Sequence, residues 1–313
     1  MEREPIARAR GLALAFATAA LVALATIALV DRPARAAFPG DNGRIAFNSD
    51  RDGDPEIYSM QPNGSDVRQL THNDASDFKN SYSPNGKRIA FNSDRDGDFE
   101  IFVMRANGTH QHQITHNTFD DRFPACSPNG KRIVFDSNRD GDDEIYTMRT
   151  DGTGVHQLTH NTTATEIQAV WSPNGKQIAF TSDRDGDSEI FVMRANGSHQ
   201  HPITHNAFDD RQANYSPNGA KIAFTSDRDG NAEIWVMRSN GDHQHPLTHT
   251  SVPSVNNAPA FSPNGRLITW SPIRAPDLDR EVFVMHANGT HQHPITHNDL
   301  FNDQLPDWQP LRR

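Results

Sequence analysis

Cysteine, aromatic residues and positive charge are all scarce in this sequence. Cys126 is the single cysteine among 313 residues, so no disulfide can form within the chain. Hydrophobic residues make up 35% of the chain and aromatic residues 8%, a low content that suits many short strands joined by polar turns. The formal net charge is −10 and no basic stripe is present, which argues against nucleic acid as a partner.

Long apolar runs are absent except near the N-terminus. Three arginines precede an uncharged run over residues 11–30, and Ala-Arg-Ala follows at 34–36. This order is typical of a secretory signal with a small-residue cleavage site. The run of 20 residues is also long enough to span a bilayer, so an uncleaved anchor is the alternative. We expect residues 1–36 to be a signal peptide or an anchor, and the rest of the chain to be extracytoplasmic.

What the sequence has in abundance is repetition. One phrase recurs six times with small changes: Ser-Pro-Asn-Gly-Lys-Arg-Ile-Ala-Phe-x-Ser-Asp-Arg-Asp-Gly-Asp-x-Glu-Ile-Phe-Val-Met-Arg-Ala-Asn-Gly. Its first isoleucine returns every 44 to 46 residues, at Ile45, Ile89, Ile133, Ile178, Ile222 and Ile268. This period is typical of the blade of a β-propeller and not of a helical repeat.

The second repeat shows how one unit becomes a blade. Alternating apolar residues predict four short strands, over residues 80–83, 88–93, 100–104 and 113–115. Pro-Asn-Gly, Asp-Arg-Asp-Gly-Asp and Ala-Asn-Gly separate them and are turn sequences. Proline replaces Gln113 in three other repeats, which marks the fourth strand as an edge. The sequence therefore predicts an all-β, six-bladed propeller over residues 38–313, four antiparallel strands to a blade.

The end of the chain indicates how the ring closes. Residues 305–308 match the innermost strand of a repeat, but no second, third or fourth strand follows them. We expect this strand, with Trp308, to complete the first blade, whose other strands begin near Arg44. Phe38 competes for the same slot, and we expect it to be frayed. Cys126 stands where other repeats have an aromatic residue, which predicts a small buried apolar group and not a nucleophile.

Three phrases carry a family resemblance: residues 171–176, Trp-Ser-Pro-Asn-Gly-Lys; 181–186, Thr-Ser-Asp-Arg-Asp-Gly; and 189–193, Glu-Ile-Phe-Val-Met. They resemble the WD-like repeat of the TolB-type β-propeller family, and the match covers about residues 41 to 308. The resemblance implies an exported six-bladed propeller that serves as a platform for protein contacts. The small α/β domain that precedes the propeller in TolB itself is missing from this sequence, so TolB's own envelope role and partner are not carried over.

Carboxylates are predicted to gather on one rim of the propeller, where the turns between strands two and three meet the long connections between blades. The turns contribute Asp50, Asp52, Asp54, Asp94, Asp96, Asp98, Asp140, Asp142, Asp183, Asp185, Asp187, Asp227 and Asp229. The connections add Asp77, Asp120, Asp121, Asp209 and Asp210.

These acidic turns have two interpretations. In the first they are hairpins in which the first aspartate caps backbone N–H groups and the arginine pairs with an acid of the same or the adjacent blade. In the second, alternating carboxylates beside a glycine bind a hard cation. The second predicts weak calcium sites where three acids alternate: Asp50, Asp52 and Asp54; Asp94, Asp96 and Asp98; Asp183, Asp185 and Asp187. Otherwise no cofactor is expected.

Histidine is the second enrichment, with 16 residues. His-Gln-His opens the fourth strand in four repeats, at His110, His199, His243 and His291. A transition-metal site is one interpretation and an exposed outer strand is the other, because two histidines without a third ligand make a weak site. A further histidine, such as His116, follows the fourth strand of every repeat, and this identical repetition indicates a structural role.

The one strong break in the repeat is in blade six, where residues 271–280 replace the tight turn. We predict a partner-contact loop there, through Arg274, Asp277, Asp279 and Arg280. Because near-identical blades build a surface without a unique reactive centre, we predict an exported, monomeric, non-enzymatic scaffold. It would contact a protein or a cell-envelope glycan through its rim loops. The alternative is a metal-dependent hydrolase or lyase with histidine and aspartate over the central channel.

Overall fold

The computed structural model describes residues 38–250, 254–274, 279–297 and 300–311. The predicted signal segment, residues 1–36, lies outside the described residues. Within the described part, no helix is long and apolar enough to cross a membrane. All regular structure described there is β-strand, in six sheets of four antiparallel strands.

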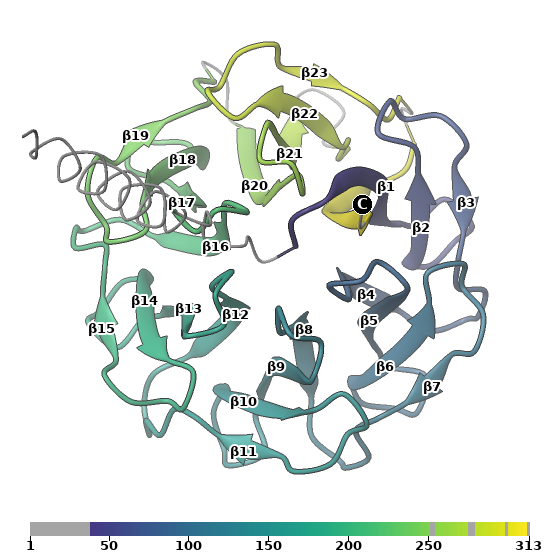
Figure 1. Cartoon of the computed structure of the whole chain (residues 1–313), viewed down its shortest axis with the longest axis horizontal. Coiled ribbons are helices and arrows are strands. Elements are labelled where there is room, and N and C mark those ends of the chain that lie inside the picture. The colour runs from purple at the N-terminus through teal and green to yellow at the C-terminus, as the bar shows by residue number, and fades with distance from the viewer. Residues whose placement is uncertain (1–37, 251–253, 275–278, 298–299, 312–313) are drawn as a thin grey trace, which may run out of the picture. The chain divides into compact units, whose positions relative to one another are not determined.

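The sheets are arranged as the blades of a ring (Figure 1). Blades one to three contain β24 (Asp303–Leu311), β1 (Asp41–Ser49), β2 (Glu56–Met60) and β3 (Arg68–Gln69); β4 (Asp77–Tyr82), β5 (Arg88–Ser93), β6 (Glu100–Arg105) and β7 (His112–Gln113); β8 (Asp121–Cys126), β9 (Arg132–Ser137), β10 (Glu144–Arg149) and β11 (His156–Gln157). Blades four to six contain β12 (Glu166–Trp171), β13 (Gln177–Ser182), β14 (Glu189–Arg194) and β15 (His201–Pro202); β16 (Asp210–Tyr215), β17 (Lys221–Ser226), β18 (Glu233–Arg238) and β19 (His245–Pro246); β20 (Ser254–Phe261), β21 (Leu267–Arg274), β22 (Phe283–His286) and β23 (His293–Pro294).

Ring closure follows the prediction. The C-terminal strand β24 pairs antiparallel with β1, and Trp308 lies opposite Ile45. Trp308 is 2% exposed and donates from its indole Nε1 to Thr269 Oγ1 at 3.0 Å. Phe38 does not compete for this strand and is not frayed, because it packs against the apolar cluster shared by blades two and three.

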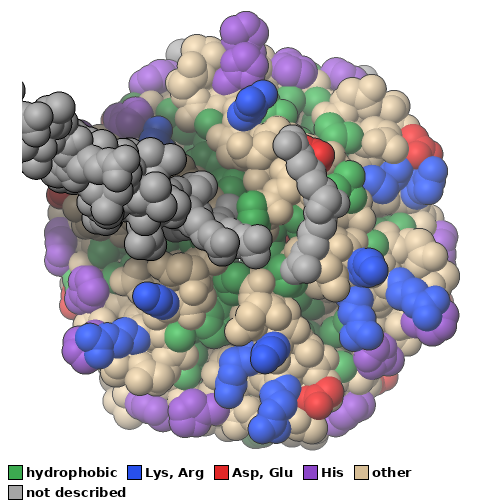
Figure 2. All heavy atoms as spheres, viewed as in Figure 1, with side chains coloured by type: hydrophobic (Ala, Val, Ile, Leu, Met, Phe, Trp, Pro, Cys, Tyr) green, Lys and Arg blue, Asp and Glu red, His purple; other side chains and the backbone are tan. Residues whose placement is uncertain are grey.

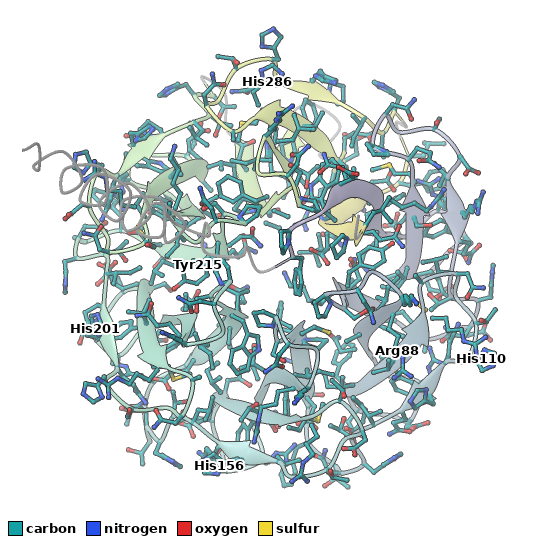
Figure 3. All side chains as sticks on the ribbon, viewed as in Figure 1. Arg88, His110, His156, His201, Tyr215 and His286 are labelled. Atoms are coloured by element: carbon teal, nitrogen blue, oxygen red, sulfur yellow. The ribbon has the colours of Figure 1, made fainter. Side chains whose placement is uncertain are left out.

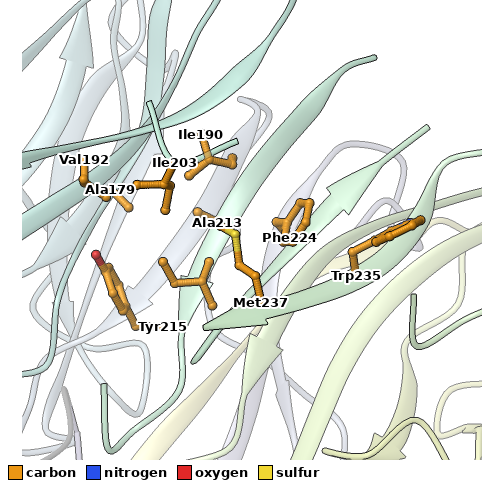
Figure 4. Packing of buried hydrophobic residues seen from close by; sticks show 10 residues of the cluster. Ala179, Ile190, Val192, Ile203, Ala213, Tyr215, Phe224, Trp235 and Met237 are labelled. Carbon is orange, nitrogen blue, oxygen red and sulfur yellow. The ribbon is translucent and has the colours of Figure 1, made fainter. Parts of the chain in front are cut away.

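The apolar core lies between neighbouring blades. Figure 4 shows the cluster between blades four and five, where Ile190 and Val192 of β14 face Ala213 and Tyr215 of β16. The middle strands are buried on both faces, so β5 is exposed only at its first residue. Cys126 is 7% exposed in the equivalent cluster, and burial raises the pKa of its thiol to about 12. The predicted apolar role of this cysteine is confirmed.

The innermost strands begin earlier than the sequence predicts. In blade two the strand starts at Asp77 and not at Asn80, and its pairing with β5 slips between Phe78 and Ser81. The same slip interrupts the pairing of the innermost strand with its neighbour in all six blades. Each slip is a β-bulge that turns one residue of the strand away from the ladder.

Candidate functional site

The six innermost strands surround a central cavity of about 120 Å³. At the same place in each bulge stands a residue with positive φ, between 51° and 60°: Lys79, Phe123, Gln168, Gln212, Ala258 and Leu305. All six line the cavity; we call them the channel ring. None is glycine, so each left-handed backbone costs about 1–2 kcal/mol. Such strain persists where the surrounding structure enforces it, most often at functional sites.

The preceding blade holds each residue of the channel ring in place. The backbone N–H of Lys79 donates to Asn48 Oδ1 at 3.1 Å, and that of Gln168 donates to both carboxylate oxygens of Asp136 at 3.0 Å. Asn48 and Asp136 occupy the same position in the second strands of their blades. The channel ring is therefore fixed by a repeated contact between blades, and its side chains are free to differ.

Side-chain chemistry in the channel ring does differ, although the rest of the repeat is nearly constant. Lys79 places its ammonium 5.8 Å from the centre of the Phe123 ring. Burial lowers the pKa of Lys79, partly offset by Asp307 and Asp136. Burial also raises the pKa of Asp307 to about 6. Sequence reasoning missed this ring, and the available signal was variation at one position of an otherwise constant repeat.

A second repeated arrangement joins neighbouring blades near the acidic turns. At the junction of blades two and three, Glu100 and Asp121 face each other, and both are buried. The amide of Asn117 donates to Glu100 Oε2 at 3.2 Å and to Asp121 Oδ2 at 2.9 Å. Arg139 binds both oxygens of Asp121 at 2.8 Å. We call this set of glutamate, asparagine, acid and arginine a junction network.

Most junctions repeat the network with the same residue types. The buried acid and its arginine are Asp77 with Arg95, Asp121 with Arg139, Glu166 with Arg184, Asp210 with Arg228, and Asp303 with Arg51. In each pair both partners belong to one blade, as the hairpin interpretation predicts. Asp77, Asp121 and Asp210 pair with arginines of the rim turns, as their predicted place on the rim requires, but all three are 0% exposed and are not part of its surface.

Crowded carboxylates change the protonation of the glutamates in these networks. Burial is the main cause that raises the pKa of Glu56 to about 8 and that of Glu100 to about 7. Coulombic repulsion adds to the effect, from Asp77 on Glu56 and from Asp121 on Glu100. At neutral pH such a glutamate is mostly or partly protonated, and the pair of acids can share one proton.

The hydrogen bonds of the acidic turns agree with the first interpretation, in which the turns are hairpins. Asp94 Oδ1 accepts the N–H of Ser76 at 2.7 Å, and Asp183 Oδ1 accepts that of Thr165 at 2.7 Å. Gly97 closes its turn with an N–H to Asp94 O at 2.9 Å and a φ of 107°. The predicted capping role of the first aspartate is thereby confirmed, and the same acids cap the chain as it enters the innermost strand.

Among the described residues, one group of three carboxylates is close enough to bind a single ion. This group differs from the three triplets predicted from the sequence. Oxygens of Asp140, Asp142 and Glu144 lie within 4.8 Å of one another. In the predicted triplets the first acids cap backbone, and Asp54, Asp98 and Asp187 each keep one buried oxygen without a hydrogen-bond partner. The calcium sites at Asp50, Asp52 and Asp54, at Asp94, Asp96 and Asp98, and at Asp183, Asp185 and Asp187 stay predictions.

Comparison with known proteins was made on the sequence and on this fold. The model of the TolB beta propeller domain matches residues 29–122, 76–169 and 160–251, which together exceed half of the chain. The chain belongs to this TolB propeller family. A search of curated proteins finds no match.

Solved structures show the same fold. The structure of TolB from Acinetobacter baumannii has a TM-score of 0.74 and 23% identity, over 87% of this chain and 68% of that one. A putative TolB from Agrobacterium tumefaciens has a TM-score of 0.69 and 20% identity, over 86% and 92% of the two chains. An oligogalacturonate lyase in complex with manganese has a TM-score of 0.54 and 11% identity, over 83% and 74%. At these identities the likeness concerns the fold alone.

The histidines of this TolB-type propeller lie away from the central cavity. Figure 3 shows His110, His156, His201 and His286 at the outer edge of the ring, and all four are exposed. Among the described residues that line the cavity, none is a histidine. In each His-Gln-His phrase the first histidine has positive φ and belongs to a turn, and the glutamine binds backbone carbonyls. The alternative hypothesis placed histidine and aspartate ligands of a metal over the channel. In the described part of the chain, no histidine lies there.

The predicted partner loop of blade six is described only in part. The side chains of Arg274 and Asp277 lie outside the described residues. Arg280 donates to Gln304, and its carbonyl accepts the N–H of Asp303 at 2.7 Å. Arg280 thus ties the loop to β24, and Asp279 next to it is half-buried.

The face of the TolB-type propeller opposite the acidic turns is basic. Figure 2 shows a face with lysine and arginine side chains over several blades and histidines around its edge. Arg88 lies directly opposite Arg105 in the ladder, and Arg132 lies opposite Arg149. Like charges in such positions repel each other. The two faces of the ring therefore differ in charge, although the whole chain is acidic.

Proposed function

We propose that the chain is an exported, monomeric binding scaffold that contacts a protein partner at the mouth of its central cavity. The observation that carries the proposal is the channel ring, six strained positions whose side chains differ while the blades around them repeat. Contacts from the preceding blade hold the strained backbone of these positions. Their side chains bring a cation, an aromatic ring, amides and aliphatic groups together around the cavity. Such a mixture suits recognition of a defined partner better than catalysis by one centre.

Membership of the TolB propeller family supports a binding role, and export rests on the sequence of residues 1–36. N-terminal sequencing of protein from the envelope and the medium tests export. A mature chain that begins at residue 37 supports a cleaved signal. An intact Met1 in the membrane fraction supports an anchor.

The binding role is tested with two phenylalanines that lie close together in the sequence but in different parts of the structure. Phe123 belongs to the channel ring, and Phe119 is 43% exposed in the connection before β8. Wild-type protein, Phe123→Ser and Phe119→Ser are used as baits in an envelope extract, and the bound proteins are quantified by mass spectrometry. Binding of each enriched protein is then measured with purified components.

We expect Phe123→Ser to weaken the binding of the partner by at least tenfold and Phe119→Ser to leave it unchanged. Circular dichroism confirms that both variants keep the β-structure. A partner that binds both variants equally well would move the contact away from the cavity, to the rim or the blade-six loop. Enrichment of glycan without protein would favour the cell-envelope glycan instead.

A further inference from the structure

The turn between β9 and β10 brings three carboxylates together. Asp140 and Asp142 come from the turn, and Glu144 is the first residue of β10. One oxygen of each lies within 4.8 Å of the others. Asp140 is exposed, Asp142 is half-buried and Glu144 is 0% exposed. The group therefore runs from the surface of the rim into the junction between blades three and four.

A buried carboxylate from the next blade faces this group. Glu166, the first residue of β12, is 0% exposed. The amide of Asn161 donates to Glu166 Oε1 and its backbone N–H donates to Glu144 Oε1, which places the two glutamates beside each other. Glu166 Oε2 and Glu144 Oε2 are both buried and accept no hydrogen bond. Buried carboxylate oxygens without a donor are costly, so this pair indicates a missing positive partner.

The neighbouring junction shows what is different here. Between blades two and three, the amide of Asn117 reaches both Glu100 and Asp121. Between blades three and four, the amide of Asn161 donates to Glu166 only, and its backbone N–H donates to Glu144 Oε1. Glutamate is one methylene longer than the aspartate found at four of the other junctions. As a result, one oxygen of each glutamate is left without a donor.

We propose that Asp140, Asp142 and Glu144 bind one hard divalent cation such as Ca²⁺, with Glu166 as a further oxygen ligand from the adjacent blade. Carboxylate oxygens are the ligands that calcium prefers. The bound ion would link blade three to blade four and would satisfy the two unpartnered oxygens. This site is not among the three predicted from the sequence, because Asn138 replaces the first of the three alternating aspartates in its turn.

The competing explanation is a shared proton. Burial raises the pKa of Glu144 to about 8, with a further contribution from Glu166. A proton between the two glutamates would satisfy the same oxygens. A cation needs ionised ligands, so proton and cation compete and binding must tighten as the pH rises. Arg184 binds Glu166, Arg139 precedes Asp140 in the sequence, and Arg122 acts on the neighbouring Asp143.

The test uses the whole protein freed of metal by a chelator. Calcium binding is measured by isothermal titration at pH 6 and pH 8, and unfolding is measured with CaCl₂, MgCl₂ or NaCl of equal ionic strength. The variant Asp142→Asn removes one ligand at constant size. Asp151→Asn is the control, because Asp151 is exposed, belongs to none of the acidic turns and follows the other end of β10. Glu166→Asp restores the acid found at the neighbouring junction.

We expect one calcium ion per chain, with a dissociation constant on the order of 0.1–1 mM at pH 8 and weaker binding at pH 6. Asp142→Asn should weaken binding at least tenfold, Glu166→Asp should weaken it by less, and Asp151→Asn should leave it unchanged. Calcium should raise the melting temperature of the wild-type protein by mass action.

Three results would overturn the site. The first is stabilisation by calcium no greater than by NaCl, which would leave the shared proton as the partner of the two glutamates. The second is an equal loss in Asp151→Asn and Asp142→Asn. The third is unchanged binding in Asp142→Asn. If Asp142→Asn fails to fold, Glu166→Asp decides alone, because its shorter side chain exists at the equivalent position of other blades.

Discussion

Two junctions of the ring each bury a glutamate, but they give it different partners. Between blades one and two, Glu56 faces a second carboxylate, Asp77, and Arg95 neutralises that acid with two contacts of 3.0 Å. Between blades five and six, Glu233 faces the amide of Asn256, which donates to Glu233 Oε2 at 2.9 Å. The backbone of both junctions is the same, so a charged pair is not required to form the fold.

The difference shows that an ion pair such as Asp77 with Arg95 is one way to build a junction, and that an amide such as Asn256 is another. Asn256 also accepts a hydrogen bond from the indole of Trp270 at 3.0 Å, so the neutral junction is fully bonded at this amide. Arg95 instead stacks over Phe102 at 4.4 Å and Phe91 at 5.8 Å while it binds Asp77. A charged junction depends on its arginine, because a buried carboxylate without a partner is strongly destabilising.

The largest effect is expected when a whole junction is removed. Deletion of residues 303–313 takes away β24, including Asp303, which pairs with Arg51, and the buried Trp308. Loss of a buried tryptophan alone costs about 3–5 kcal/mol, a large part of the about 5–15 kcal/mol that stabilises a typical domain. Thermal unfolding followed by circular dichroism should show a much lower melting temperature or no cooperative transition.

Deletion of Arg312 and Arg313 alone is the control, because these residues follow β24. A chain without residues 303–313 that melts at the wild-type temperature would mean that the first blade does not need its innermost strand.

The next effect is expected from Arg95→Met, which leaves Asp77 buried beside Glu56. Removal of one partner of a buried ion pair costs about 3–5 kcal/mol. The side chain of Arg95 is 24% exposed, so we expect a loss below that range. Chemical unfolding measures it, and Arg88→Met is the matched control because Arg88 is exposed and takes part in no ion pair of the described residues. Equal losses in the two variants would show that the ion pair contributes nothing beyond surface charge.

A smaller effect is expected when the charged junction is made to resemble the neutral one. Asp77→Asn gives Glu56 an amide partner, as Asn256 does for Glu233. Arg95 then lacks its acid, but it can still reach water, whereas Asp77 cannot. We therefore expect Asp77→Asn to destabilise less than Arg95→Met does.

The double variant Asp77→Asn with Arg95→Met sharpens this comparison. It should be more stable than Arg95→Met alone, because it leaves no unpaired buried charge. If the two single losses simply add, the arginine and the aspartate act independently and the asymmetry between the junctions has another cause.

The sequence predicted the ring and its closure but not the junction networks or the channel ring. Repetition and alternation are local signals, so they place Ile45, Trp308 and the strand order correctly. The partner of Glu100 is Asp121 in the next blade, and no local pattern shows which polar residues meet across a junction. Asp121 appears in a polar loop sequence and so was predicted at the surface. The positive φ of Phe123 has no glycine to signal it, since a side chain of the preceding blade enforces it.

The smallest effect concerns the pH dependence of the charged junctions. Folding raises the pKa of Glu56 to about 8 and of Glu100 to about 7, from the ordinary value of 4.5. The folded state therefore binds protons more tightly than the unfolded state does. This contribution to stability is complete below about pH 4.5 and is lost as the pH rises through 7 to 8. Asp77 and Asp121 face these glutamates, with Arg95 and Arg139 behind them.

Between pH 7 and pH 8 we expect each glutamate to remove up to about 1 kcal/mol of stability, or up to about 2–4 °C in melting temperature. Glu56→Gln and Glu100→Gln should each reduce the slope of stability against pH, because an amide keeps the geometry and does not titrate. Equal slopes in the wild-type protein and in Glu56→Gln would mean that this glutamate keeps one charge state throughout, and that the charged and neutral junctions differ in hydrogen bonding alone.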